Sequence, residues 1–83
     1  GGTTVANGGT VNFSNASGML IANRYDTGAV TIYLCGGGGT GVVSNLGTQV
    51  GAFAYNAGIS GYTWTSSATT TYGFFFVRTR GTA

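Results

Sequence analysis

Hydrophobic and polar positions alternate along this chain in short runs that glycine and asparagine interrupt. No window carries the i, i+3, i+4, i+7 apolar stripe of an amphipathic helix, and strong helix formers are scarce, with no Glu, no Lys, one Gln and three Leu. Runs of β-branched and aromatic residues at roughly ten-residue spacing indicate an all-β fold instead. The pattern predicts strands at residues 9–13, 19–25, 29–35, 42–45, 49–55, 62–65 and 72–80.

The length sets the domain organisation, because 83 residues form one domain at most. Residues 10–83 are predicted to form a compact antiparallel β-sandwich, jelly-roll-like, of about seven to eight short strands. Residues 1–9 are predicted to be a connector with room for one extended piece. Because the chain starts with Gly1 and not with Met, we expect it to be a piece of a longer protein.

A β-hairpin is the best-defined local feature of the pattern. Strands 19–25 and 29–35 flank Asp26-Thr27-Gly28, a three-residue loop with glycine where a left-handed residue is required. This register pairs Tyr25 with Ala29. One face of the hairpin then carries the apolar residues Leu20, Ala22, Val30, Ile32 and Leu34. The other, mixed face carries Met19, Ile21, Asn23, Tyr25, Thr31, Tyr33 and Cys35.

The aromatic residues offer the first candidates for ligand contact. Because the opposite hairpin face already supplies a core, Tyr25 and Tyr33 are expected to meet solvent or a partner, with Asn23 on the same face. Tyr62 and Trp64 share a face of another strand. Two interpretations of this pair stay open: core packing, or a flat aromatic platform for a sugar ring.

The last predicted strand is apolar on both faces. Strand alternation sends Phe74 and Phe76 one way and Phe75 and Val77 the other. Because burying a phenylalanine contributes roughly 1.5–3 kcal/mol, we expect one face to pack in the core and the other against neighbouring copies. The resulting hypothesis is a homotrimer with Phe74, Phe75 and Phe76 as candidate interface residues. A central strand covered on both sides within one chain is the alternative.

Charge is nearly absent, which excludes several kinds of chemistry. Only 5% of the residues are charged, against about 25% in a typical domain. Without His, and with Asp26 as the single carboxylate side chain, the chain lacks the acid–base pairs and triads of most hydrolases, so no enzymatic activity is expected. One Cys and one Asp also exclude an ordinary metal cage, and no cofactor is expected.

The same scarcity of charge limits the partners. Three arginines are too few to track a phosphate backbone, so no nucleic acid is expected. The longest apolar run, residues 74–77, is far shorter than the roughly 20 residues of a spanning helix, so no membrane insertion is expected. Arg78 and Arg80 share a strand face and form either a solvated strand end or a site for anionic groups. Arg24 is expected to pair with Asp26, and Cys35 to be inert.

A glycine-rich loop, Gly-Gly-Gly-Gly-Thr-Gly at residues 36–41, formally matches G-x-G-x-x-G. A dinucleotide site needs a helix directly after this loop, and the sequence that follows does not form one. The segment is therefore predicted to be a surface loop. Gly37, Gly38 and Gly39 stay ligand-binding candidates because glycine lets backbone amides and carbonyls approach a ligand closely.

Four stretches, residues 18–28, 36–41, 59–65 and 74–83, together with the Gly/Ser/Thr/Asn bias and the lack of Pro, resemble the C-terminal receptor-binding tip domains of tailed-bacteriophage tail fibres and spikes. The resemblance covers essentially the whole chain. It implies an extracellular homotrimer at a virion fibre tip, joined by residues 1–9 to a longer fibre. Such domains bind host cell-surface polysaccharide, lipopolysaccharide or an outer-membrane protein. Some carry His-x-His iron sites and others cleave sugars with paired carboxylates, and this chain has the residues for neither.

The hypothesis from the sequence is therefore non-enzymatic receptor binding. The candidate receptor-binding residues are Tyr25, Tyr33, Asn23, Gly37, Gly38, Gly39, Trp64, Arg78 and Arg80. The competing interpretation is a structural subunit of an extracellular filament or a virion decoration protein that binds no ligand. Solution size separates the two, since a discrete trimer favours the tip domain and an open-ended polymer favours the filament.

Overall fold

The chain folds into eight β-strands and no helix in the computed structural model, which describes residues 2–37 and 42–79. The prediction of an antiparallel all-β fold with seven to eight short strands is confirmed. The strands are β1 (Thr3–Val5), β2 (Thr10–Ser14), β3 (Ser17–Arg24), β4 (Val30–Gly36), β5 (Val42–Gly47), β6 (Ala52–Asn56), β7 (Gly61–Thr65) and β8 (Thr70–Arg78).

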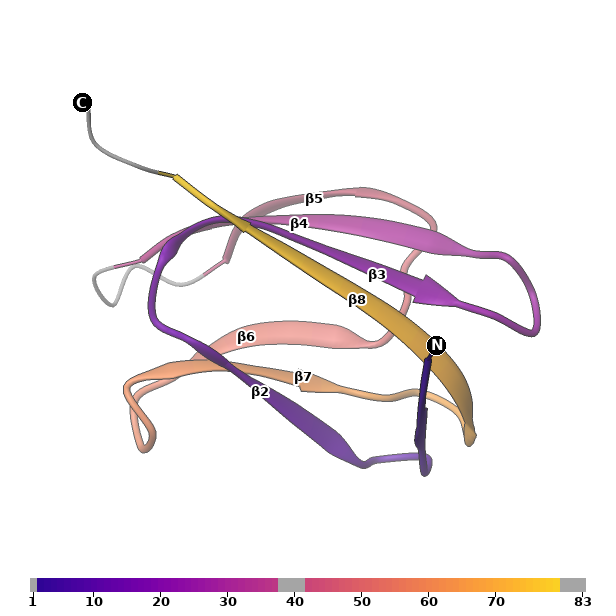
Figure 1. Cartoon of the computed structure of the whole chain (residues 1–83). Helices are drawn as coiled ribbons and strands as arrows, with labels where there is room; N and C mark the ends of the chain where they lie inside the picture. The colour runs from indigo at the N-terminus through magenta and orange to yellow at the C-terminus, as the bar shows by residue number, and fades with distance from the viewer. Residues whose placement is uncertain (1, 38–41, 80–83) are drawn as a thin grey trace.

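The strands form two layers that face each other (Figure 1). One sheet has five strands in the order β1-β8-β3-β4-β5, and the other has three in the order β2-β7-β6. Every neighbouring pair is antiparallel. Within the predicted connector, β1 pairs with β8 and so lies at the edge of the larger sheet, where Val5 is buried.

An aromatic core fills the space between the sheets. Trp64, Tyr62 and Tyr72 are fully buried, and the Trp64 ring contacts the Tyr72 ring edge-on at a centroid distance of 4.6 Å. Polar atoms of buried aromatic rings need partners, and here backbone carbonyls provide them. The Trp64 Nε1–H donates to the Val50 carbonyl at 2.8 Å and the Tyr72 hydroxyl donates to the Ala68 carbonyl at 2.9 Å.

The β3–β4 hairpin forms as predicted, but its register differs by one residue. Gly28 has a φ of 75°, which confirms the left-handed position. The Arg24 N–H donates to the Ala29 carbonyl at 2.8 Å, and the pairing continues through Asn23 with Val30 and Ile21 with Ile32. The predicted pairing of Tyr25 with Ala29 is therefore wrong, because the loop has four residues, not three.

This shift exchanges the two faces of β4. Thr31, Tyr33 and Cys35 point into the core and are 0%, 2% and 5% exposed. Val30, Ile32 and Leu34 point outward, so the prediction that Leu20 and Ile32 share a face is wrong. The physical reason is that tyrosine buries a larger apolar surface than the aliphatic residues while its hydroxyl finds acceptors between the sheets.

Candidate functional site

The outer face of the five-stranded sheet, which points away from the second sheet, is apolar and uncovered. The strand register aligns its side chains in rows across the sheet. The rows are Val77–Met19–Leu34, Phe75–Ile21–Ile32–Leu46 and Gly73–Asn23–Val30. Phe75 is 64% exposed and Leu46 is 57% exposed, and no row position holds a charged residue. We call these residues the outer face.

The alternation predicted for β8 is confirmed. Phe74 and Phe76 are half-buried and pack against the core, where their rings lie 5.7 Å and 6.0 Å from the ring of Phe13. Phe75 and Val77 point to the outer face. Of the three candidate interface residues, Phe75 is thus the one whose side chain is open to a neighbouring molecule.

The turn end of the outer face carries two of the candidate receptor-binding residues. Tyr25 is exposed and its ring lies against Gly73, where an added Cβ would come within 2.7 Å of the tyrosine hydroxyl. Asn23 is half-buried, and its Oδ1 atom is buried without a hydrogen-bond partner among the described residues. The glycine at position 73 therefore makes room for the Tyr25 ring on this face.

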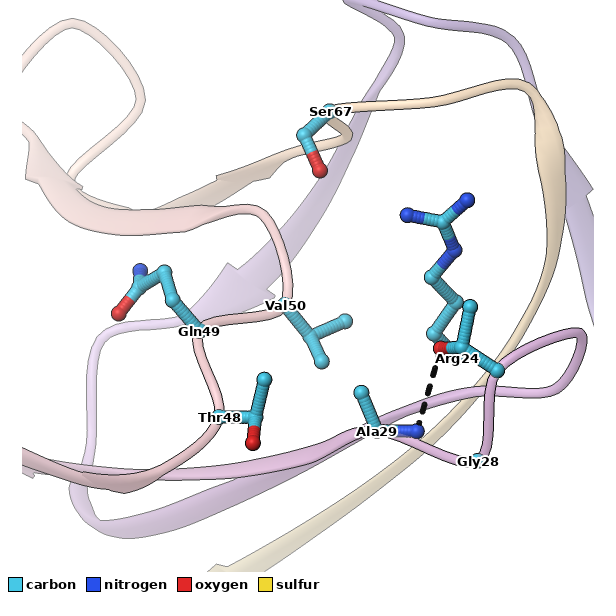
Figure 2. A pocket seen from close by; sticks show the side chains of 8 residues that line it. Arg24, Gly28, Ala29, Thr48, Gln49, Val50 and Ser67 are labelled. Atoms are coloured by element: carbon cyan, nitrogen blue, oxygen red, sulfur yellow. Dashed lines mark hydrogen bonds between the residues drawn. The ribbon is translucent and has the colours of Figure 1, made fainter.

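A second feature is a cleft of about 560 Å³ at the end of the sandwich where three connections meet. In Figure 1 the β3–β4 turn, the β5–β6 connection and the β7–β8 connection lie at this end. Figure 2 shows the side chains that line the cleft. They are Arg24, Thr27, Gly28, Ala29, Thr48, Gln49, Val50 and Ser67.

One wall of the cleft, residues 48–51, is held in place by buried side chains. The Thr31 hydroxyl donates to the Thr48 carbonyl and accepts the Val50 N–H at 2.6 Å. The Val50 carbonyl also accepts the Tyr33 hydroxyl at 2.9 Å and Trp64 Nε1–H at 2.8 Å. These bonds hold the wall of the cleft in place.

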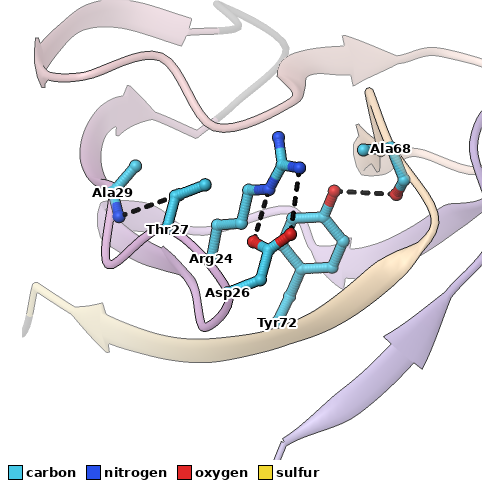
Figure 3. Close-up of polar contacts among 6 residues, drawn as sticks. All are labelled: Arg24, Asp26, Thr27, Ala29, Ala68 and Tyr72. Carbon is cyan, nitrogen blue, oxygen red and sulfur yellow. Dashed lines mark hydrogen bonds and ion pairs between the residues drawn. The ribbon is translucent and has the colours of Figure 1, made fainter.

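The opposite side of the cleft holds an ion pair, which confirms the predicted pairing of Arg24 with Asp26 (Figure 3). The guanidinium donates through Nε to Oδ1 at 2.6 Å and through Nη2 to Oδ2 at 3.1 Å. This side-chain hydrogen bond is the main cause that raises the pKa of Arg24 and lowers the pKa of Asp26. The pair therefore presents a fixed guanidinium whose charge is compensated locally.

The structure separates the remaining sequence candidates. Tyr33 and Trp64 are buried, so the expected exposure of Tyr33 is wrong, and Trp64 packs in the core instead of forming a surface platform. Gly37 is buried and donates its N–H to the Tyr62 hydroxyl at 2.8 Å. Arg78 is exposed and lies opposite Gly18, at the far end of β3 from Arg24. Gly38, Gly39 and Arg80 lie outside the described residues.

Sequence reasoning did not identify the cleft residues Thr48, Gln49, Val50 and Ser67. They lie on two of the connections that cross between the sheets, β5–β6 and β7–β8, and no local pattern marks them. The sequence marks the cleft wall only indirectly. Thr31, Tyr33 and Trp64 in the core strands carry polar atoms that need hydrogen-bond acceptors between the sheets, and the β5–β6 connection provides them.

The remaining chemistry of the described chain is limited. The Cys35 thiol is buried and contacts the carbonyls of Ala16 and Gly18, and burial raises its pKa, which keeps it protonated and unreactive. Within residues 2–37 and 42–79, no three His, Cys, Asp or Glu side chains come together as metal ligands would. In the same ranges, no helix has the length and hydropathy to cross a membrane.

Comparison with protein-family models, with curated proteins and with solved structures finds no match. A functional conclusion therefore depends on the outer face, the cleft and the composition of the chain.

Proposed function

We propose that the chain is a non-enzymatic receptor-binding domain that acts as a homotrimer at the tip of a tailed-bacteriophage fibre. In this proposal residues 1–9 join it to the fibre, and it recognises host cell-surface polysaccharide, lipopolysaccharide or an outer-membrane protein. The observation that carries the proposal is the outer face, because a surface of this kind needs a partner. The resemblance of the sequence to fibre tip domains supports the location.

The outer face is large enough to form part of an interface. Strands lie about 4.8 Å apart and residues on one face about 7 Å apart, so the ten positions of the three rows cover about 340 Å² in projection. That is about 7% of the total accessible surface of 4633 Å², and it is less than half of the roughly 800 Å² that each partner of a standard-size interface buries. The largest apolar patch of a typical monomer, about 300–600 Å², is often a functional surface.

A second copy of the chain is the partner that best fits the outer face. The rows contain no charge, so the face offers nothing that would select a charged partner. With a net charge of +2, copies also repel each other weakly. Closed symmetry about an axis would cover every copy of the face and so prevent further growth. This argument supports a discrete assembly.

A structural filament subunit is the second candidate, and one observation favours it. The three-stranded sheet ends in β2 and β6, and neither edge pairs with another strand in the described part of the chain. Free strand edges can template the addition of further chains. An open-ended assembly would use these edges, whereas the closed trimer uses the outer face.

Binding to immobilised glycan tests the receptor-binding proposal. Wild-type chain, Phe75→Asp and Ile59→Asp would be applied to surfaces that carry bacterial capsular polysaccharide or lipopolysaccharide. Ile59 is 45% exposed and lies in the β6–β7 turn, away from the outer face, so it is the matched control. Because linked sites gain avidity of about 10²–10⁴, we expect Phe75→Asp to bind at least about a hundredfold more weakly than the other two.

Analysis of the bound glycan tests the part of the proposal that says the chain does not cleave its receptor. We expect the recovered glycan to keep its length, because the chain has a single carboxylate side chain and no His. Released oligosaccharide would contradict this. Failure of the wild-type chain to bind any such surface or whole bacterial cells would reject receptor binding and leave the filament subunit.

A further inference from the structure

We infer that the cleft between the two sheets binds a neutral sugar ring through neighbouring hydroxyl groups, with Arg24 and Ser67 as the residues that contact them. The inference rests on the proposed function only for the source of the sugar, a cell-surface glycan. The cleft volume of about 560 Å³ falls within the range of about 300–1,000 Å³ found for small-molecule sites.

The lining of the cleft matches the two-sided chemistry of a sugar ring. Ala29 is partly exposed and lines the cleft beside Val50, which is 1% exposed, so Ala29 is the apolar part of the floor that C–H groups can touch. Figure 2 shows the Arg24 guanidinium extending past this floor toward the side where Ser67 lies. The hydroxyl, amide and guanidinium groups around the floor supply donors and acceptors for sugar hydroxyls.

Arg24 has donors left for a ligand. A guanidinium carries five N–H donors in a fixed plane. Nε and Nη2 donate to Asp26, and within the described residues Nη1 donates to no acceptor. Two N–H groups that point in fixed directions suit adjacent hydroxyl oxygens. The hydroxyl of Ser67 also makes no hydrogen bond in the described part of the chain, so it is free to donate or accept.

The charge of the site favours a neutral ligand over an anion. Oδ1 of Asp26 lies 2.6 Å from Nε of Arg24, so the carboxylate compensates the charge of the guanidinium. The remaining lining residues are uncharged, and the other described arginine, Arg78, lies at the opposite end of β3. A phosphate or carboxylate would therefore find one cation that is already paired, while a diol needs only the free donors.

The cleft wall is also fixed in advance, which lowers the entropic cost of binding. Residues 48–51 receive the hydrogen bonds of Thr31, Tyr33 and Trp64. Gly51 has a φ of 69°, and a Cβ there would lie 2.5 Å from the Thr65 carbonyl, so the chain can take this path only with glycine. A wall held this way loses little freedom when a ligand binds.

The test is an NMR titration of the whole 83-residue chain with the methyl glycosides of glucose, galactose, mannose and rhamnose, and with inorganic phosphate as a separate arm. Single sugar rings bind at millimolar levels, so concentrations up to about 50 mM are needed. We expect at least one glycoside to shift the backbone amides of Gly28, Ala29, Gln49 and Ser67. Arg24→Gln should weaken this binding at least about tenfold. Arg78→Gln removes an arginine at the opposite end of β3, outside the cleft, and should leave the shifts of the cleft amides unchanged.

Ser67→Ala protects the test against misfolding of the Arg24 variant. It removes one exposed hydroxyl and should weaken binding about threefold or more with an otherwise unchanged spectrum. The inference is overturned if no glycoside shifts the cleft amides, or if the largest shifts lie outside the cleft. It is also overturned if Ser67→Ala and Arg24→Gln both bind like wild type. A larger shift of the cleft amides with phosphate than with every glycoside would overturn it as well. Light scattering on the same samples reports assembly, so a chain that assembles but binds no sugar rejects the cleft and not the assembly.

Discussion

Three buried polar residues, Thr31, Tyr33 and Trp64, direct their hydrogen bonds to the same connection between the two sheets. Each could have been replaced by an apolar residue if the core needed only volume. Their cost of burial is offset because Thr48 and Val50 accept or donate the bonds. At the scale of single residues, the core therefore fixes the β5–β6 connection and the cleft wall together.

Tyr33→Phe tests the role of this hydroxyl. We expect a loss of about 1 kcal/mol in the free energy of unfolding, because the Val50 carbonyl keeps its bond from Trp64. Hydrogen exchange at residues 48–51 should also become faster. Urea unfolding and exchange NMR measure both effects. Tyr25→Phe, which removes an exposed hydroxyl, is the control and should change stability by less than about 0.5 kcal/mol. Equal stability of the two variants would show that the Tyr33 hydroxyl does not hold the wall.

Alkaline pH should destabilise the fold. Burial raises the pKa of Tyr33 and Tyr62 above 10.0 and that of Cys35 above 9.0, the ordinary values that the unfolded chain keeps. The stability from these groups is fully present below those ordinary values and is lost as pH rises through the raised pKa values. Urea unfolding at about pH 8 and about pH 11 measures it. A free energy of unfolding that stays constant or rises between these values would contradict the burial of these groups.

At the scale of elements, the sequence predicts the strands well because β-branched and aromatic runs alternate with glycine. It also predicts the β3–β4 hairpin and the positive φ of Gly28. The predicted register differs from the observed one because the length of the loop decides which face each residue of β4 occupies. The segment Asp26-Thr27-Gly28 is compatible with a loop of three residues and with one of four. Tyrosine is common on buried and on exposed faces of a sheet, so Tyr33 does not distinguish between the two registers.

Gly28→Val tests the hairpin turn. Apart from its two chain neighbours, no residue comes within 4 Å of a Cβ at this position, so a substitution there acts mainly through the backbone. Because a β-branched residue resists a φ of 75°, we expect a loss of more than about 1 kcal/mol in the free energy of unfolding. Gly28→Asn is the matched control, since asparagine tolerates the left-handed region and should cost less. If both variants unfold at the wild-type urea concentration, the turn has another conformation.

At the scale of the whole molecule, the register decides how the surface is interpreted. A slip of one residue would place tyrosines outside and aliphatic residues inside, whereas the observed pairing places Val30, Ile32 and Leu34 on the outer face beside Phe75. The apolar character of β8 on both sides was visible in the sequence, but the rows that join it to β3, β4 and β5 depend on the sheet order. The cleft could not be predicted from the sequence, because Arg24, Gln49 and Ser67 come to line one cleft only in the folded chain, after it has crossed between the sheets.

The mass of the chain in solution, measured by light scattering at micromolar concentration, tests the outer face most directly. One copy weighs 8.3 kDa, and we expect the wild-type chain and Ile59→Asp to have about three times this mass. Phe75→Asp should have the mass of one copy, because a carboxylate in the middle row of the outer face cannot be buried unpaired. A wild-type chain that stays monomeric, or a Phe75→Asp variant that assembles like wild type, would contradict assembly through the outer face.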